Sequence, residues 1–145
     1  MSTALLNRLL QTAIAHNASD VHVQHGSPPL LRIEGRVRPV DVPPLTADDL
    51  RGFAAVVLDE YAAAILNTEG SCDLTYSFSE DGRFRVNVFY QQDVPALAFR
   101  RVHARIPTFE ELNLPPIVAE IASAERGLVL VTGTTGSGKG PTSGA

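Results

Sequence analysis

The stretch that decides the fold is Gly82-Arg83-Phe84-Arg85-Val86-Asn87-Val88-Phe89, in which polar and apolar side chains alternate. Because successive side chains of a strand point to opposite faces, this alternation predicts a strand with one buried and one exposed face. Residues 74–78 alternate in the same way before Asp81-Gly82, a pair typical of hairpin turns. Gln92-Asp93 predicts the next turn, into a strand over residues 96–102. The middle of the chain therefore predicts three antiparallel strands.

Short elements precede these strands. Apolar residues over positions 5–14 recur at helical spacing, and Asn17 suits the end of that helix. The pattern favours a helix docked on the core over one lying on a membrane surface, since its face offers a single basic residue. Residues 20–24, 30–34 and 37–40 predict strands, with Gly35-Arg36 as a tight turn between the last two.

Two helices are expected between these groups of strands. Thr46 and Asp49 stand three residues apart, close to a capping box, and predict a helix that buries Leu50 and Phe53. A second helix follows and ends at Gly70.

Composition excludes several classes of protein. The 145 residues carry 16 acidic and 12 basic side chains, which argues against a general nucleic-acid binder. Cys72 is the single cysteine, so no internal disulfide or cysteine-based zinc site is possible, and a reducing compartment is favoured. No apolar run approaches the roughly 20 residues that span a bilayer, and no secretory signal peptide is seen. We therefore expect a cytoplasmic protein without a transmembrane segment.

The carboxyl-terminal end predicts a different unit. After a linker, Thr108 and Glu111 form a capping-box pattern for a short helix, and Pro115-Pro116 opens another helix that runs through Glu125. Residues 128–131 are continuously apolar, which is typical of a strand buried on both faces of a parallel sheet.

The residues directly after that strand match the P-loop pattern Gly-x-x-x-x-Gly-Lys. They are Gly133, Thr134, Thr135, Gly136, Ser137, Gly138 and Lys139. Glycines let backbone N–H groups converge on phosphate oxygens, and Lys139 adds a compact positive charge. The alternative interpretation is a glycine-rich surface loop.

One position departs from this motif. Gly140 stands where a serine or threonine hydroxyl would bind Mg²⁺, and Pro141 follows it. The later strands that normally carry the metal-holding acid and the group that orients water are absent before Ala145. We expect a domain cut off early and inactive in hydrolysis; a fragment end and an altered reading frame both remain open explanations.

Several segments together resemble the type IV pilus retraction (twitching motility) ATPases, the PilT/PilU group of the secretion ATPases. The segments are Ala18-Ser19-Asp20-Val21-His22, residues 28–35, residues 82–89, Phe99-Arg100-Arg101-Val102, Ile106-Pro107-Thr108, and residues 126–133 that lead into the P-loop. Their order and spacing make the resemblance specific, and it covers nearly the whole chain.

The resemblance implies a PAS-like α+β amino-terminal domain over residues 1–104, a linker over 105–114, and the truncated start of a RecA-like ATPase domain over 115–145. It implies a hexameric ring that binds ATP between its two domains and uses Mg²⁺. Residues 133–140 would bind the nucleotide, and Lys139, Arg85 and Arg100 would be catalytic. The implied partner is an inner-membrane pilus platform protein, to which the cytoplasmic motor would be peripheral.

Alternatives to these assignments stay open. Arg85 and Arg100 could belong to a solvated sheet face, and Arg83 and Arg101 are weaker candidates than either. Asp20 and His22 share a strand face, but His25 points the other way, so we expect no metal site. The resemblance gives Asp20 a structural role, accepting backbone N–H bonds at the strand start. The chain could also be a non-catalytic assembly module, or part of a pilus-assembly or type II secretion ATPase.

Overall fold

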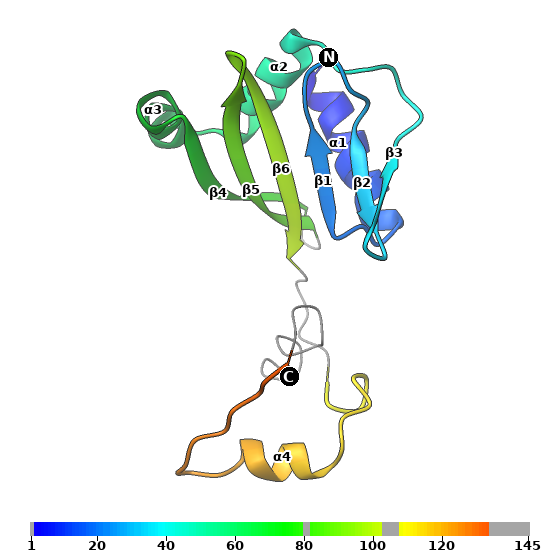
Figure 1. Ribbon diagram of the computed structural model, residues 1–145, viewed down its shortest axis with the longest axis vertical. Helices are drawn as coiled ribbons and strands as arrows, with labels where there is room; N and C mark the ends of the chain where they lie inside the picture. The colour runs from blue at the N-terminus through cyan, green and yellow to red at the C-terminus, as the bar shows by residue number, and fades with distance from the viewer. Residues whose placement is uncertain (1, 80–81, 103–107, 134–145) are drawn as a thin grey trace. The chain divides into compact units, whose positions relative to one another are not determined.

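The computed structural model describes residues 2–79, 82–102 and 108–133. The chain divides into two compact units, Met1–Ala104 and Arg105–Ala145. Over the described residues, the first unit is a six-stranded antiparallel sheet with three helices (Figure 1). The expected α+β class of this part is therefore confirmed.

The sheet brings distant parts of the sequence together. Its strands are β1 (Asp20–Val23), β2 (Leu30–Ile33), β3 (Arg36–Pro39), β4 (Ser71–Ser79), β5 (Gly82–Gln91) and β6 (Val94–Val102). They lie in the order β3-β2-β1-β6-β5-β4, so β1 pairs with β6 in the middle of the sheet (Figure 1). The three strands predicted for the middle of the chain are confirmed as β4, β5 and β6.

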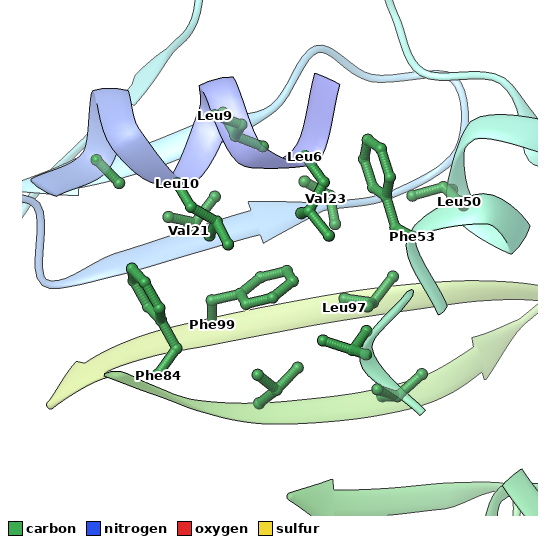
Figure 2. Packing of buried hydrophobic residues seen from close by; sticks show 14 of the residues in the cluster. Leu6, Leu9, Leu10, Val21, Val23, Leu50, Phe53, Phe84, Leu97 and Phe99 are labelled. Carbon is green, nitrogen blue, oxygen red and sulfur yellow. The ribbon is translucent and has the colours of Figure 1, made fainter. Parts of the chain in front are cut away.

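One face of the sheet is buried under helices. The helix α1 (Ser2–Ala15) lies behind β1 and β2, and α2 (Ala47–Val57) continues this layer (Figure 1). Leu10 of α1 points toward Val21 of β1 and Phe99 of β6, and Leu6 lies beside Val23 of β1 (Figure 2). This confirms the docked helix, because both leucines are fully buried. Asn17 ends the helix with a φ of 51°, as expected.

The second helix begins, and the third helix ends, at the residues that the sequence indicates. The Oγ1 of Thr46 accepts a hydrogen bond from the Asp49 backbone N–H at 3.2 Å, and the Asp49 carboxylate accepts one from the Thr46 backbone N–H at 3.0 Å. This reciprocal capping box starts α2. Gly70, with a φ of 78°, ends α3 (Glu60–Glu69).

The alternation in β5 is confirmed residue by residue. Phe84, Val86 and Val88 are at most 1% exposed and form part of the core. Arg83 and Arg85 flank Phe84 in sequence and are exposed on the other face. That second face is open to solvent within the first unit, and it carries the polar side chains described below.

One of the predicted turns needs correction. The β2–β3 turn consists of Glu34 and Gly35, with φ values of 49° and 77°, because Arg36 already pairs with Ile33. The predicted pair Gly35-Arg36 was therefore displaced by one residue. Gln92 and Asp93 form the β5–β6 turn as expected, with φ values of 51° and 61°. Asp81 of the predicted β4–β5 turn lies outside the described residues.

The second unit contains less regular structure than the sequence predicts. Its helix α4 spans Ile117–Ala122 and stops short of Glu125. The hydrogen bonds of the Thr108–Glu111 capping box form, but the described backbone there makes turns and not a helix.

The strand predicted at residues 128–131 is wrong for the described structure. These residues form no strand, and Leu128 is 82% exposed. A strand buried on both faces needs neighbouring strands for its backbone hydrogen bonds, and none of the described residues pairs with this segment. Within the described ranges, no helix has the length and apolar character to cross a bilayer.

Candidate functional site

A row of polar side chains crosses the exposed face of the sheet. Asp20 of β1 is the register partner of Arg32 on β2 and of Arg100 on β6. Arg100 is in turn opposite Arg85 of β5, and Arg85 is opposite Thr75 of β4. Register partners in antiparallel strands project to the same face, so these five side chains stand side by side across five strands.

Asp20 is the one buried charged side chain among the described residues, with 8% of its surface exposed. Its Oδ1 accepts a hydrogen bond from Arg100 Nε at 3.0 Å, and its Oδ2 lies 3.3 Å from Arg32 Nε. The Ser19 hydroxyl also donates to Oδ2, at 2.8 Å. These partners replace the backbone N–H bonds that were expected for Asp20, so that expectation was wrong. The carboxylate instead bridges two arginines on either side of its strand.

The surroundings of Asp20 keep it ionised. Burial alone raises the pKa of its carboxyl group, because it disfavours the charged form. The hydrogen bond from Ser19, followed by the hydrogen bond and positive charge of Arg100, lowers that pKa by more. The pKa of Asp20 therefore lies below its ordinary value, and the carboxylate carries its full charge at neutral pH.

Arg85 and Arg100 form a like-charge pair. They occupy directly opposite positions on β5 and β6, where like charges destabilise a sheet. The Arg100 side chain is 75% exposed and contacts Asp20 through Nε. Among the residues that the structure describes, Arg85 makes no side-chain hydrogen bond or ion pair. The pair thus presents guanidinium N–H groups to solvent, which is the chemistry that binds carboxylate or phosphate oxygens.

A shallow hollow of about 370 Å³ lies beside this pair. Besides Asp20, Arg85 and Arg100, its lining includes three polar side chains of the next row: His22, Asn87 and Asp73. Asn87 donates to the Cys72 carbonyl oxygen at 3.4 Å, and His22 Nε2 is buried without a hydrogen-bond partner in the described part of the chain. The hollow therefore has one side with two arginines and another side with hydrogen-bonding groups that include the Asp73 carboxylate.

The weaker arginine candidates differ in position. Arg83 is exposed, on the same face as Arg85 but one step further toward the end of the sheet. Arg101 projects to the opposite face, since it is the partner of buried Phe84. Its Nη1 donates to Asn17 Oδ1 at 3.0 Å, which ties β6 to the end of α1. Arg101 is thus a structural residue.

Sequence reasoning overlooked Arg32 as part of this group. Its alternation within β2 places it on the polar face, but its contact with Asp20 depends on how β2 pairs with β1. The spacing within residues 28–35 carries no information about that pairing.

The described residues offer no resident metal site. No group of three or more histidine, cysteine, aspartate or glutamate side chains within them is placed to hold an ion. His25 is exposed beyond the end of β1, away from Asp20 and His22.

Comparisons with known proteins agree on one group. No protein-family model matches the chain. The type IV pilus ATPase PilU of Pseudomonas aeruginosa is 36% identical over 132 residues, which are 91% of this chain and 35% of PilU. The type IV pilus retraction ATPase PilT of the same organism is 32% identical over 94% of this chain and 40% of PilT. The solved structure of the pilus retraction motor PilT with bound ADP superposes with a TM-score of 0.81, at 40% identity over 94% of this chain.

The chain is a homologue of the PilT and PilU group of ATPases. The segments that resemble this group in sequence therefore reflect common ancestry. The match is to the amino-terminal domain of PilT-like ATPases, with its antiparallel sheet and helices. The chain spans about two fifths of the length of its PilT and PilU relatives.

The P-loop segment of this PilT and PilU homologue is only partly described. Gly133 is described and exposed. Thr134, Thr135, Gly136, Ser137, Gly138, Lys139 and Gly140 lie outside the described residues, so the predicted nucleotide-binding loop stays a prediction from sequence.

Proposed function

We propose that this chain is the amino-terminal part of a type IV pilus retraction ATPase, in which Arg85 and Arg100 bind the phosphates of ATP. The observation that carries the proposal is the directly opposed arginine pair on the exposed sheet face. Such a pair costs stability in the free protein, because like charges face each other. An anion with several oxygens offsets that cost, and charge-assisted bonds from guanidinium groups are strong.

Each candidate residue has a separate role in the proposed site. Backbone N–H groups of residues 133–138 cradle the phosphates, and Lys139 places its ammonium on the outer ones. Arg85 and Arg100 neutralise the negative charge that develops on the transferred phosphoryl group. Mg²⁺ would supply charge neutralisation between the outer phosphates, and Gly140 offers no hydroxyl for it.

The remaining parts of the proposal concern the assembled motor. The amino-terminal domain is PAS-like, the second unit is the start of a RecA-like domain, and six subunits form a cytoplasmic ring. ATP binding and hydrolysis then move the two domains against each other, and the ring acts on a pilus platform protein of the inner membrane. Support for this comes from homology to PilT and PilU, which covers about two fifths of those proteins.

Nucleotide binding by the 145-residue chain tests the arginine assignment. Arg85→Ala and Arg100→Ala should each weaken ATP binding about tenfold, because each removes a charge-assisted contact. Arg38→Ala is the matched control, since Arg38 is an exposed arginine on β3 whose register partner is core residue Leu31. Equal affinities of all three variants and the parent chain contradict the proposal. A changed oligomeric state with unchanged affinity supports the assembly-module alternative.

We also propose that this chain does not hydrolyse ATP by itself. Gly140 lacks the metal-binding hydroxyl, and the acid and water-orienting group of P-loop enzymes are absent from the 145 residues. The purified chain should release no phosphate from ATP and Mg²⁺ above background. Turnover that disappears in Lys139→Ala would overturn this point.

A further inference from the structure

We infer that Asp20 is a positioning residue for Arg100: it holds the guanidinium by Nε and leaves both Nη groups free to bind an anion. The inference rests on the proposed function, in which that anion is the phosphate chain of ATP. It replaces the role in starting the strand that the sequence indicates for Asp20.

The Nε–H of the Arg100 guanidinium is bound to Asp20, whereas its Nη groups are not. A guanidinium offers five N–H groups, and Asp20 Oδ1 takes the one on Nε at 3.0 Å. Within the described residues the Arg100 side chain makes no other hydrogen bond or ion pair, and 75% of it is exposed. The four N–H groups on Nη1 and Nη2 are therefore available on the solvent side, next to Arg85.

The carboxylate itself is held firmly enough to act as an anchor. Asp20 is 8% exposed, and its second oxygen is fixed by the Ser19 hydroxyl at 2.8 Å and by Arg32 Nε at 3.3 Å. A short side chain with three partners has little freedom to move. Arg100, by contrast, is long and exposed. Without Asp20, an anion that binds Arg100 would have to restrict the conformational freedom of this side chain, and that restriction would weaken binding.

The charge of Asp20 and its positioning role predict opposite changes in anion affinity when the Asp20 charge is removed. By charge alone, Asp20 weakens anion binding, because it is a negative group beside the arginines. By positioning, it strengthens binding, because it orders Arg100 in advance. At about 0.15 M salt, ions screen the repulsion between Asp20 and an exposed anion in part, although less than between two exposed charges, whereas the ordering effect does not depend on salt. We expect positioning to dominate under these conditions.

The test uses the ¹⁵N-labelled 145-residue chain, inorganic tripolyphosphate as the probe, and the arginine Nε–H signals as the readout. In the parent chain, the Arg100 Nε–H signal should be protected from solvent exchange both before and after tripolyphosphate is added. In Asp20→Asn, that protection should fall, because a neutral amide oxygen accepts a weaker hydrogen bond than a carboxylate, and tripolyphosphate should bind about threefold to tenfold more weakly. A structural role in the strand would not move this signal in a folded protein.

Arg38→Ala is the matched control. It removes an exposed arginine of the same sheet, on β3, whose register partner is Leu31 and not Asp20. This variant should keep the Arg100 signal, with an affinity within about twofold of the parent chain. Asp20→Asn in the Arg100→Ala background should have no further effect on affinity, because the residue that Asp20 positions is gone.

Three outcomes separate this inference from the proposal beneath it. If Arg100→Ala leaves tripolyphosphate binding unchanged, the proposed function fails. If Arg100→Ala weakens binding but Asp20→Asn binds as tightly as the parent chain or more tightly, the positioning role is wrong. If Asp20→Asn does not fold, the Arg100 Nε–H signal of the parent chain is the test. Loss of its protection from solvent exchange when tripolyphosphate binds would overturn the inference.

Discussion

The ring of Phe99 stands edge-on to the ring of Phe84, with centroids 6.1 Å apart and an interplanar angle of 89°. Both rings are at most 1% exposed, and they lie on the buried face of β5 and β6. Arg85 and Arg100 are the next residues along these two strands and project to the opposite face. The aromatic pair therefore supports the two backbones from which the opposed arginines project.

Truncating this aromatic pair should destabilise the whole first unit. We expect Phe99→Ala to lower the free energy of unfolding by about 3–5 kcal/mol, because it leaves a cavity and removes the aromatic contact. Urea denaturation measures this loss. Tyr61→Ala is the control, since Tyr61 is 76% exposed and should change stability by no more than about 0.5 kcal/mol. Similar losses for both variants contradict the packing described here.

Removing one arginine should stabilise the free protein. We expect Arg85→Gln to raise the free energy of unfolding by about 0.2–1 kcal/mol, because it removes the cross-strand repulsion from Arg100. The gain should shrink at high salt, where exposed charges are screened. Thermal melts at low and high sodium chloride concentration measure it. A loss of stability at low salt shows that the two charges do not repel in the free chain.

The contribution of Asp20 to stability should depend on pH in one direction. The pKa of Asp20 is lower in the folded protein than in the unfolded chain. At pH values between these two pKa values, the unfolded state therefore binds more protons than the folded state. Its stabilising contribution is therefore present above the ordinary aspartate pKa of about 3.9 and is lost as pH falls through the folded pKa.

Urea midpoints at neutral and acid pH check this prediction. The stability difference between the parent chain and Asp20→Asn should be largest near neutral pH and should shrink steadily below about pH 4. A difference that grows toward acid pH would show that the pKa of Asp20 is raised on folding. Ser19→Ala should narrow the pH range over which the stabilising contribution of Asp20 is lost, because the Ser19 hydroxyl donates a hydrogen bond that helps to lower the pKa of Asp20.

The start of α2 offers a further prediction about stability. Thr46→Ala removes the side chain that caps the Asp49 backbone N–H and should cost about 1 kcal/mol. Thr46→Ser keeps the hydroxyl and should cost much less. The same alanine variant should raise the pKa of Asp49, which hydrogen bonds from Thr46 now hold below its ordinary value. Chemical denaturation and NMR titration of the Asp49 carboxyl group measure the two effects.

Local patterns in the sequence predicted most of the first unit. The alternation in residues 82–89 identified which side chains of β5 are buried, and the Thr46–Asp49 spacing located the start of α2, because both depend on neighbours in sequence. Turn position was missed at Glu34-Gly35, since it depends on the pairing of β2 with β3.

These local patterns could not predict which strands, distant in sequence, pair with each other. The resemblance to the PilT and PilU group pointed to Arg85 and Arg100, and the structure makes them register partners. The bridge from Asp20 to Arg32 and Arg100 required the order of β2, β1 and β6, which no local spacing encodes. At residues 128–131, an apolar run alone predicted a buried strand, but strand formation also needs partner strands.

The pairing of β1 with β6 has a consequence for how the domain is made. Asp20 and Arg100 are 80 positions apart, so the middle of the sheet cannot close until the last strand has been synthesised. At about 5–20 residues per second, the ribosome needs roughly 4–16 seconds to cover that distance. During this interval β1 lacks β6, the strand that pairs with its inner edge. Pairing between strands this far apart in sequence also slows folding. The two arginines reach their opposed positions only in this final step, so the proposed anion site cannot form before the sheet is complete.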